Sequence, residues 1–250
     1  MRGFHPHEPT TLSFGRAREG TSRLIERRGD MYPEESRNGV EVASHRVARE
    51  IRERIVTGDL PPGTRIFQDE LADELHTSRI PVRDALRILQ SNGLVTLKSN
   101  RGAWVIKLSH RQYDLNYKIR EELEPLLIAE SLAQITDEDV AAIVELQRRI
   151  EEGPDDATYL ALDRELHFRT YKGHEGELMD TVTRLWDTTA HHRRMFTKLS
   201  RPTLQVVFNA EHQLLIEALR NRDAEDARAI LAMHIRRTRR SLAQHPEIFE

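Results

Sequence analysis

A helix with two distinct faces, predicted between Ser78 and Asn92, constrains this chain more than any other feature. Its apolar side chains recur at helical spacing and would pack inward: Val82, Ala85, Leu86 and Leu89. Its basic side chains lie four residues apart and form a row on another face: Arg79, Arg83 and Arg87. Ser78 stands at the N-cap position, and Pro81 falls in the first turn, where proline is tolerated. Such a helix can pack on its domain and still present its cationic row to a DNA duplex.

The neighbouring segments complete a winged helix-turn-helix, which we delimit as residues 40–107. An amphipathic helix is predicted from Glu41 to Thr57. A short helix at 69–75 then precedes the cationic helix across a tight turn. Residues 94–106 predict a β-hairpin with turn-forming residues at its tip, 99–102, and this hairpin would be the wing.

Charge is distributed unevenly along the chain. The formal net charge is −3, yet the stretch from Arg79 to Lys107 holds six basic side chains against one acid, Asp84, whereas residues 108–250 are acidic. A local basic patch of this kind attracts nucleic acid. Any one of these arginines can instead form a surface ion pair, as Arg83 or Arg87 can with Asp84. Charge alone therefore leaves both interpretations open.

The composition excludes several kinds of site and location. The chain has no cysteine and 12 histidines, so a metal ion would have to be held by His, Asp or Glu. No stretch approaches ~18 uninterrupted apolar residues, and the amino terminus lacks a signal-peptide core. We therefore expect a cytoplasmic protein without a membrane partner. Residues 1–39 show little periodicity and are expected to form a flexible arm.

Residues 108–250 show no strand alternation and predict an all-α bundle, so the fold class is mainly α. Helical stripes cover six segments: about 111–133, 137–152, 157–172, 176–198, 204–221 and 224–244. Thr136 and Asp223 are suited to cap two of these helices. Arg201–Pro202 is expected to break the chain between two others.

Four polar side chains fall on the apolar stripes of this bundle. Asp163 and His167 lie four residues apart on one helix, while His212 and His234 continue the stripes of two others. Burying them without partners would cost several kcal/mol, and a shared ion would remove that cost. One carboxylate and three imidazoles suit Zn²⁺, Ni²⁺ or Mn²⁺, with Glu211 placed to orient an imidazole. On the residues alone, a hydrogen-bonded polar core is the other interpretation.

The segment 40–107 resembles a known family. It carries the following runs: Leu60-Pro61-Pro62-Gly63-Thr64, Glu70-Leu71-Ala72, Ser78 to Arg87, Gly93-Leu94-Val95 and Arg101 to Val105. Together they resemble, without a gap over residues 40–107, the DNA-binding domain of GntR-family transcription regulators. The resemblance implies that Arg79 and Arg83 contact DNA and that the wing tip, Asn100-Arg101-Gly102, enters the minor groove.

Elementary chemistry assigns matching roles. An arginine fork can bond O6 and N7 of guanine, which suits the first two arginines of the row, while Ser78 and Lys98 suit phosphates. Arg87, the third member of the row, is a further candidate for DNA contact. Some relatives have a DNA-contacting arginine just ahead of the second helix, where this chain has Asp69, so that contact is expected to be missing.

The second half resembles the FCD effector domain of the FadR subfamily within GntR regulators. The resemblance rests on four short runs in order: Arg120 to Glu124, Leu162 to His167, Glu211-His212 and Ala232-Met233-His234. It implies an effector cavity near Arg120 and a metal ion held by the four polar residues of the bundle. An ion pair between Arg120 and Glu124, one turn on, is the alternative for that arginine.

Two functions of different classes remain. We predict a transcription regulator, not an enzyme, that binds a pseudo-palindromic double-stranded operator as a homodimer and responds to a small carboxylate-bearing effector at the metal. The sequence does not determine the sign of regulation, and repression is the working description. The alternative is a metal-dependent hydrolase with an accessory winged helix. Against it, Glu165 points away from Asp163 and His167, and no further general base is evident.

Overall fold

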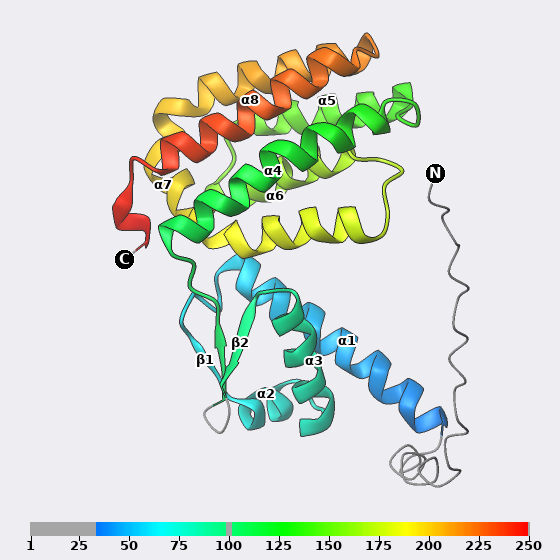
Figure 1. The fold of residues 1–250 in the computed structure, drawn as a ribbon, viewed down its shortest axis with the longest axis vertical. Coiled ribbons are helices and arrows are strands. Elements are labelled where there is room, and N and C mark those ends of the chain that lie inside the picture. The colour runs from blue at the N-terminus through cyan, green and yellow to red at the C-terminus, as the bar shows by residue number, and fades with distance from the viewer. Residues whose placement is uncertain (1–33, 99–101, 250) are drawn as a thin grey trace, which may run out of the picture. The chain divides into compact units, whose positions relative to one another are not determined.

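Residues 34–98 and 102–249 are described in the computed structural model of the chain (Figure 1). The elements follow in this order: α1 Glu34–Thr57, β1 Arg65–Ile66, α2 Gln68–Glu74, α3 Arg79–Ser91, β2 Val95–Lys98, β3 Gly102–Val105, α4 His110–Ser131, α5 Asp137–Glu151, α6 Asp156–Arg169, α7 Glu177–Arg220, α8 Ala224–Leu242 and the 3₁₀ helix η1 Pro246–Phe249. The predicted class, mainly α with a small β-hairpin wing, is confirmed.

The winged-helix domain packs α1, α2 and α3 with a small antiparallel sheet. Its core contains the two predicted helical stripes: Val47, Ala48, Ile51, Ile55, Val82, Ala85, Leu86 and Leu89. Strand β3 pairs with both neighbours in the order β1-β3-β2, and Lys98 lies opposite Gly102 at the end of the wing. Strand β1 was not expected, because two residues are too few to show an alternating pattern; Ile66 is buried in it, whereas Arg65 is exposed.

The boundaries differ from the predicted ones at the start of the chain. Helix α1 begins at Glu34, whereas the predicted helix begins at Glu41, so residues 34–40 belong to the helix as well. Extending an established helix adds a hydrogen bond for each residue that becomes ordered, so weakly helical residues can join it. Residues 1–33, and residues 99–101 of the predicted wing tip 99–102, lie outside the described residues.

The second domain is a bundle of α4 to α8. Helix α4 packs against α7 and α8, and α5 packs against α6 and α7. Thr136 and Asp223 accept backbone N–H bonds at the starts of α5 and α8, as predicted, and Ser109 caps α4 in the same way. These helices bury one continuous apolar core that includes Tyr117 and Trp186. None of the described helices is long and apolar enough to cross a bilayer.

The predicted break at Arg201–Pro202 is wrong as a helix end. Helical structure continues from Glu177 to Arg220 in a single element, α7, so the described bundle has five α-helices where six segments were expected. The ribbon of α7 nevertheless changes direction along its length (Figure 1). Proline removes one N–H and crowds the preceding turn, which bends a helix more readily than it ends one when both halves are packed. Phe196 and Phe208 are buried on either side of the proline.

Candidate functional site

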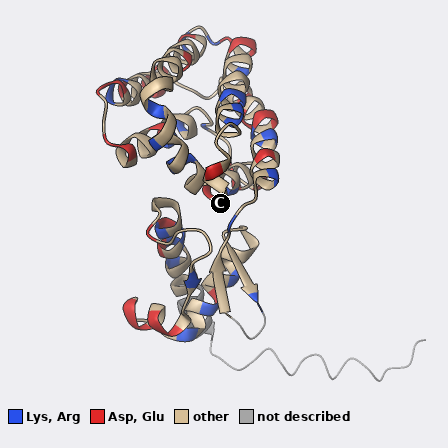
Figure 2. Ribbon diagram, turned by 90° about the vertical axis from the view of Figure 1, so that its left-hand side faces the viewer, with Lys and Arg blue, Asp and Glu red and all other residues tan. Residues whose placement is uncertain are grey.

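The arginine row of α3 is exposed in the structure. Arg79 Nε lies 2.6 Å from Asp69 Oδ1, which belongs to α2. Arg87 Nη1 lies 3.0 Å from Asp84 Oδ1, one turn earlier on the same helix. No described side chain pairs with Arg83, so its guanidinium can reach a duplex without first leaving a partner. Acidic and basic residues therefore lie close together in this part of the winged helix (Figure 2).

The structure describes some of the other residues that were predicted to contact DNA. Ser78 is the N-cap of α3 and makes no side-chain capping bond to that helix, so its hydroxyl is available to a phosphate. Lys98 ends β2, with its ammonium 5.0 Å from the centroid of the Trp104 ring. Gly102 opens β3 with φ of 108°, a conformation that favours glycine. Asn100 and Arg101 belong to the wing tip, which the structure does not describe.

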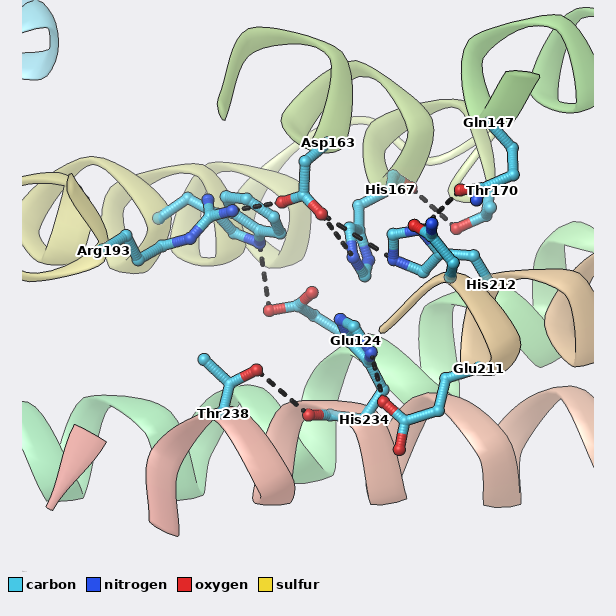
Figure 3. A network of polar contacts seen from close by, with 12 residues as sticks. Glu124, Gln147, Asp163, His167, Thr170, Arg193, Glu211, His212, His234 and Thr238 are labelled. Carbon is cyan, nitrogen blue, oxygen red and sulfur yellow. Dashed lines mark hydrogen bonds and ion pairs between the residues drawn. The ribbon is translucent and has the colours of Figure 1, made fainter. Parts of the chain in front are cut away.

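The four polar residues predicted to hold a metal ion come together in the bundle. Asp163 and His167 on α6, His212 on α7 and His234 on α8 are at most 9% exposed. Each offers one ligand atom, and these atoms all lie within 4.8 Å of one another. Asp163 Oδ1 is 3.9 Å from His167 Nε2 and 3.7 Å from His212 Nε2. Figure 3 shows the carboxylate and the imidazoles converging from different helices.

Hydrogen bonds on the far side of two imidazoles select the nitrogen that faces this cluster. His234 Nδ1 donates to Glu211 Oε2 at 2.9 Å. Gln147 Nε2 donates to Glu151, which leaves Gln147 Oε1 to accept from His212 Nδ1 at 2.8 Å. Both rings therefore carry a proton on Nδ1 and turn Nε2 toward the cluster, and Nε2 is then the nitrogen available to a metal ion.

Burial keeps the cluster in a state suited to metal binding. Burial lowers the pKa of His212 to about 4 and that of His167 well below its usual value, and the neighbouring imidazoles add to the effect. Burial alone would raise the pKa of Glu211, but the hydrogen bonds from His234 and Arg237 outweigh it, so this pKa is lowered. At neutral pH His167 and His212 therefore offer neutral nitrogens, and the carboxylate of Glu211 is ionised.

The Asp163 carboxylate is divided between two sets of partners. Its Oδ1 faces the imidazoles, whereas its Oδ2 accepts a hydrogen bond from Arg193 on α7. The Arg193 guanidinium also lies over the Trp186 ring, 4.0 Å from its centroid. Arg193 therefore holds Asp163 from one side and leaves one carboxylate oxygen for an ion.

These residues fit a divalent metal ion. His212 Nε2 is buried and has no hydrogen-bond partner among the described atoms, an arrangement that costs free energy unless a ligand satisfies it. Three imidazoles and one carboxylate form a donor set that Zn²⁺, Ni²⁺ and Mn²⁺ accept. The hydrogen-bonded polar core considered from the sequence accounts for the outer nitrogens of His212 and His234, but not for this inward one.

A small cavity of about 40 Å³ lies beside the cluster, lined among others by Arg120, Asp163, His167, Arg193, Arg201 and His234. Arg120 is already paired, because its Nε donates to Glu124 Oε1 at 2.5 Å. Its guanidinium also lies over the rings of Tyr117 and Trp186. The alternative ion pair is therefore present. Arg120 Nη1, however, is buried without a hydrogen-bond partner in the described part of the chain, so one donor remains for a ligand.

Asp187 on α7 connects the bundle with the winged helix inside the compact unit Val40–Glu250. This carboxylate is 4% exposed and accepts two hydrogen bonds from Arg52 of α1, at 2.5 and 2.8 Å. It also lies 3.0 Å from Arg164 Nη2 of α6. One ion-pair network therefore joins α1 to α6 and α7, and Arg164 directly follows Asp163 in the chain.

Comparison with known proteins agrees with this two-part organisation. Residues 43–105 match the family model described as bacterial regulatory proteins, gntR family, and residues 115–237 match the FCD domain model. The chain is a GntR-family transcription regulator with an FCD domain.

Relatives of this GntR regulator include proteins named as HTH-type transcriptional regulators. It is 26% identical over 194 residues to the HTH-type transcriptional regulator YdhC of Bacillus subtilis, covering 74% of this chain and 84% of the relative. It is 26% identical over 219 residues to the HTH-type transcriptional repressor RspR of Escherichia coli, covering 86% and 95%. The solved structure of McbR/YncC from E. coli matches with a TM-score of 0.68 at 25% identity, over 81% of this chain and 97% of that one.

Two residues that support the site in this GntR regulator were missed from sequence. Gln147 interrupts the apolar stripe that runs from Ile143 to Ile150 on α5, and a polar residue at that position was a usable signal. Arg193 gave no such signal, because it lies in a run of basic residues on α7 and only the fold directs it to Asp163. Glu211 was correctly expected beside an imidazole.

Proposed function

We propose that this regulator binds a pseudo-palindromic DNA operator as a homodimer and is modulated by a small organic acid bound beside a divalent metal ion in its FCD domain. One observation carries the proposal: a buried Asp-His₃ cluster borders a cavity lined by arginines, in the same chain as an exposed cationic helix. The first feature suits an anion and a metal, and the second suits a duplex.

The metal would be held by Asp163, His167, His212 and His234, and when bound it would offer a coordination position to a ligand oxygen. We assign the remaining donor of Arg120 to the effector carboxylate, since an arginine fork suits that group. The cavity of about 40 Å³ has room for roughly three water molecules, which favours a small acid.

On DNA, we assign Arg79 and Arg83 to base edges in the major groove, with Ser78 and Lys98 on phosphates and Arg87 as an additional contact. The wing tip, Asn100-Arg101-Gly102, would enter the minor groove. The pairing of Arg87 with Asp84 makes it the weakest candidate of the row. Since a regulator must meet the chromosome, we place its action in the cytoplasm.

An exposed apolar stripe on α4 supports the proposal of a homodimer. Leu115, Ile119 and Leu126 project from one face of this helix and are 46%, 44% and 41% exposed. A second copy of the chain would cover such a stripe, and two recognition helices would read the two halves of the operator. Ile119→Asp should then convert dimers to monomers in light scattering. A wild-type chain that is monomeric both free and on its operator would contradict this part of the proposal.

The network at Asp187 supplies a physical route between the two domains. An effector that shifts α6 or α7 would alter the hold of Asp187 on Arg52, and hence the freedom of α1. The hydrolase alternative has less support. Glu165 is exposed and pairs with Arg169, and Asp163 is the one carboxylate among the described residues that line the cavity.

A thermal-shift screen of small organic acids, run with and without Zn²⁺, Ni²⁺ or Mn²⁺, tests the effector half. Metal should raise the unfolding temperature, an effector should raise it further only with metal, and His212→Ala should abolish both effects while leaving DNA affinity little changed. If protein purified without chelator holds no metal and takes up none on titration, the four residues form a hydrogen-bonded polar core and not a metal site.

A further inference from the structure

The ion pair between Arg79 and Asp69 joins the two helices of the helix-turn-helix at the surface that meets DNA. Asp69 is the second residue of α2, and Arg79 is the first residue of α3. Their side chains are 61% and 75% exposed, and Asp69 Oδ1 lies 2.6 Å from Arg79 Nε. An exposed pair of this kind adds little to stability, so its effect is better sought in what it does to the arginine.

The contact leaves the useful end of the guanidinium open. A guanidinium has five N–H donors, so a carboxylate beside Nε restricts the group and still leaves the pair of Nη donors for another acceptor. Guanine is read by two donors directed at O6 and N7, and a good pair of this type discriminates between bases by roughly 5- to 150-fold. An arginine that is already oriented loses less side-chain freedom when it makes that contact.

The same carboxylate has an opposite effect on DNA in general. It brings a negative charge close to the phosphates and occupies a cation that would otherwise attract them. Arg83 has no such partner within the described chain, and Arg87 is paired within its own helix. Arg79 therefore stands out in the row, because its partner comes from another helix.

We propose that Asp69 is a specificity-determining residue, which positions Arg79 for one base pair of the operator and at the same time weakens binding to unrelated DNA. The inference rests on the proposed base-reading role of Arg79. A positioning role can be distinguished from a purely structural one. If Asp69 only stabilised α2, its loss would weaken binding to every duplex. If it positions Arg79, its loss should weaken binding to the operator and strengthen binding to unrelated DNA.

The test begins with selection of binding sites from a random duplex library by the full chain. The base pair read by Arg79 is the one at which Arg79→Ala loses its preference. At that base pair, Asp69→Asn should reduce the ratio of affinities for the preferred and the other bases by at least threefold. The same variant should bind a random duplex several-fold more tightly and with steeper salt dependence. Asp69→Glu, which keeps the charge, should retain part of the preference.

Glu70→Gln is the matched control, since it removes the same charge from the same turn of α2 without touching Arg79. It should leave the ratio unchanged, and Asp69→Asn should have no further effect on the ratio in an Arg79→Ala chain. If Asp69→Asn leaves the affinity ratio unchanged, or weakens binding to all duplexes equally, this inference is wrong, while the base-reading role of Arg79 still stands. If Arg79→Ala itself alters no base preference, the base-reading role of Arg79 fails and the inference fails with it.

Discussion

Replacing Glu211 by Gln tests how far the metal centre depends on a residue outside the ligand set. The substitution keeps the size of the side chain and removes the charge that holds the proton on His234 Nδ1. A neutral amide at position 211 binds the His234 Nδ1 proton less strongly than a carboxylate does. The ring is then held less firmly in the orientation that turns Nε2 toward the cluster. Loss of such a supporting partner weakens metal binding by roughly 10- to 100-fold.

The size of the effect follows from linkage. At a metal concentration 100 times the wild-type Kd, binding stabilises the folded state by ~2.7 kcal/mol. A variant with tenfold weaker binding retains ~1.4 kcal/mol at the same concentration, and one with hundredfold weaker binding retains ~0.4 kcal/mol. Each kcal/mol moves the Tm of a chain of this length by roughly 2–4 °C. The metal-induced shift should therefore fall from roughly 5–11 °C to roughly 1–6 °C.

Scanning calorimetry with and without Zn²⁺ measures this shift within each variant, so any loss of stability of the metal-free protein cancels. Glu217→Gln is the matched control, because Glu217 lies on the same helix and is exposed, and its partners among the described residues are Arg220 and Asn221 at the end of that helix. It should keep the full shift. If Glu211→Gln responds to Zn²⁺ as strongly as the wild type, then Glu211 does not orient His234 for an ion, and the reasoning about the outer hydrogen bonds is refuted.

Three further outcomes are expected. Arg83→Ala should cost ~1–3 kcal/mol on the selected operator and blur one base pair, whereas Lys98→Ala should weaken all duplexes alike; binding titrations that show equal losses on specific and random DNA for Arg83→Ala would contradict base readout. Burial lowers the pKa of His192 to about 4, and the unfolded chain takes up this proton first. The contribution of His192 to stability should therefore be lost as pH drops from about 6.5 toward 4, by at most ~3 kcal/mol, in addition to any loss from His167 and His212. His192→Phe should make the slope less steep in urea titrations of metal-free protein. An unchanged slope in the His192→Phe variant would show that His192 does not contribute to this dependence of stability on pH. Asp187→Asn should lower the free energy of unfolding by no more than ~3 kcal/mol, because Arg52 is 35% exposed. It should also reduce the influence of metal and effector on DNA affinity, and intact coupling in this variant would rule out the proposed route.

Local pattern was enough for the elements that depend on one face of one helix. The stripe from Val82 to Leu89 predicted a helix that is buried on that side, and its arginines are exposed on the other. Thr136 predicted the start of α5 because a hydroxyl at an N-cap has its partner three residues away. The break predicted at Pro202 was wrong, because the packing of α7 on both sides of the proline outweighs the local preference.

The sequence by itself determined that Asp163, His167, His212 and His234 face inward, since helical periodicity assigns each of them to an apolar stripe. Only the tertiary structure decided that the four meet, which nitrogen of each supported imidazole turns toward the others, and that Arg193 holds the second oxygen of Asp163. The physical reason is the separation along the chain over which each effect acts. Periodicity is set by contacts within a few residues along one helix, whereas convergence depends on how three helices pack, and residues 163 and 234 are neighbours only through that packing.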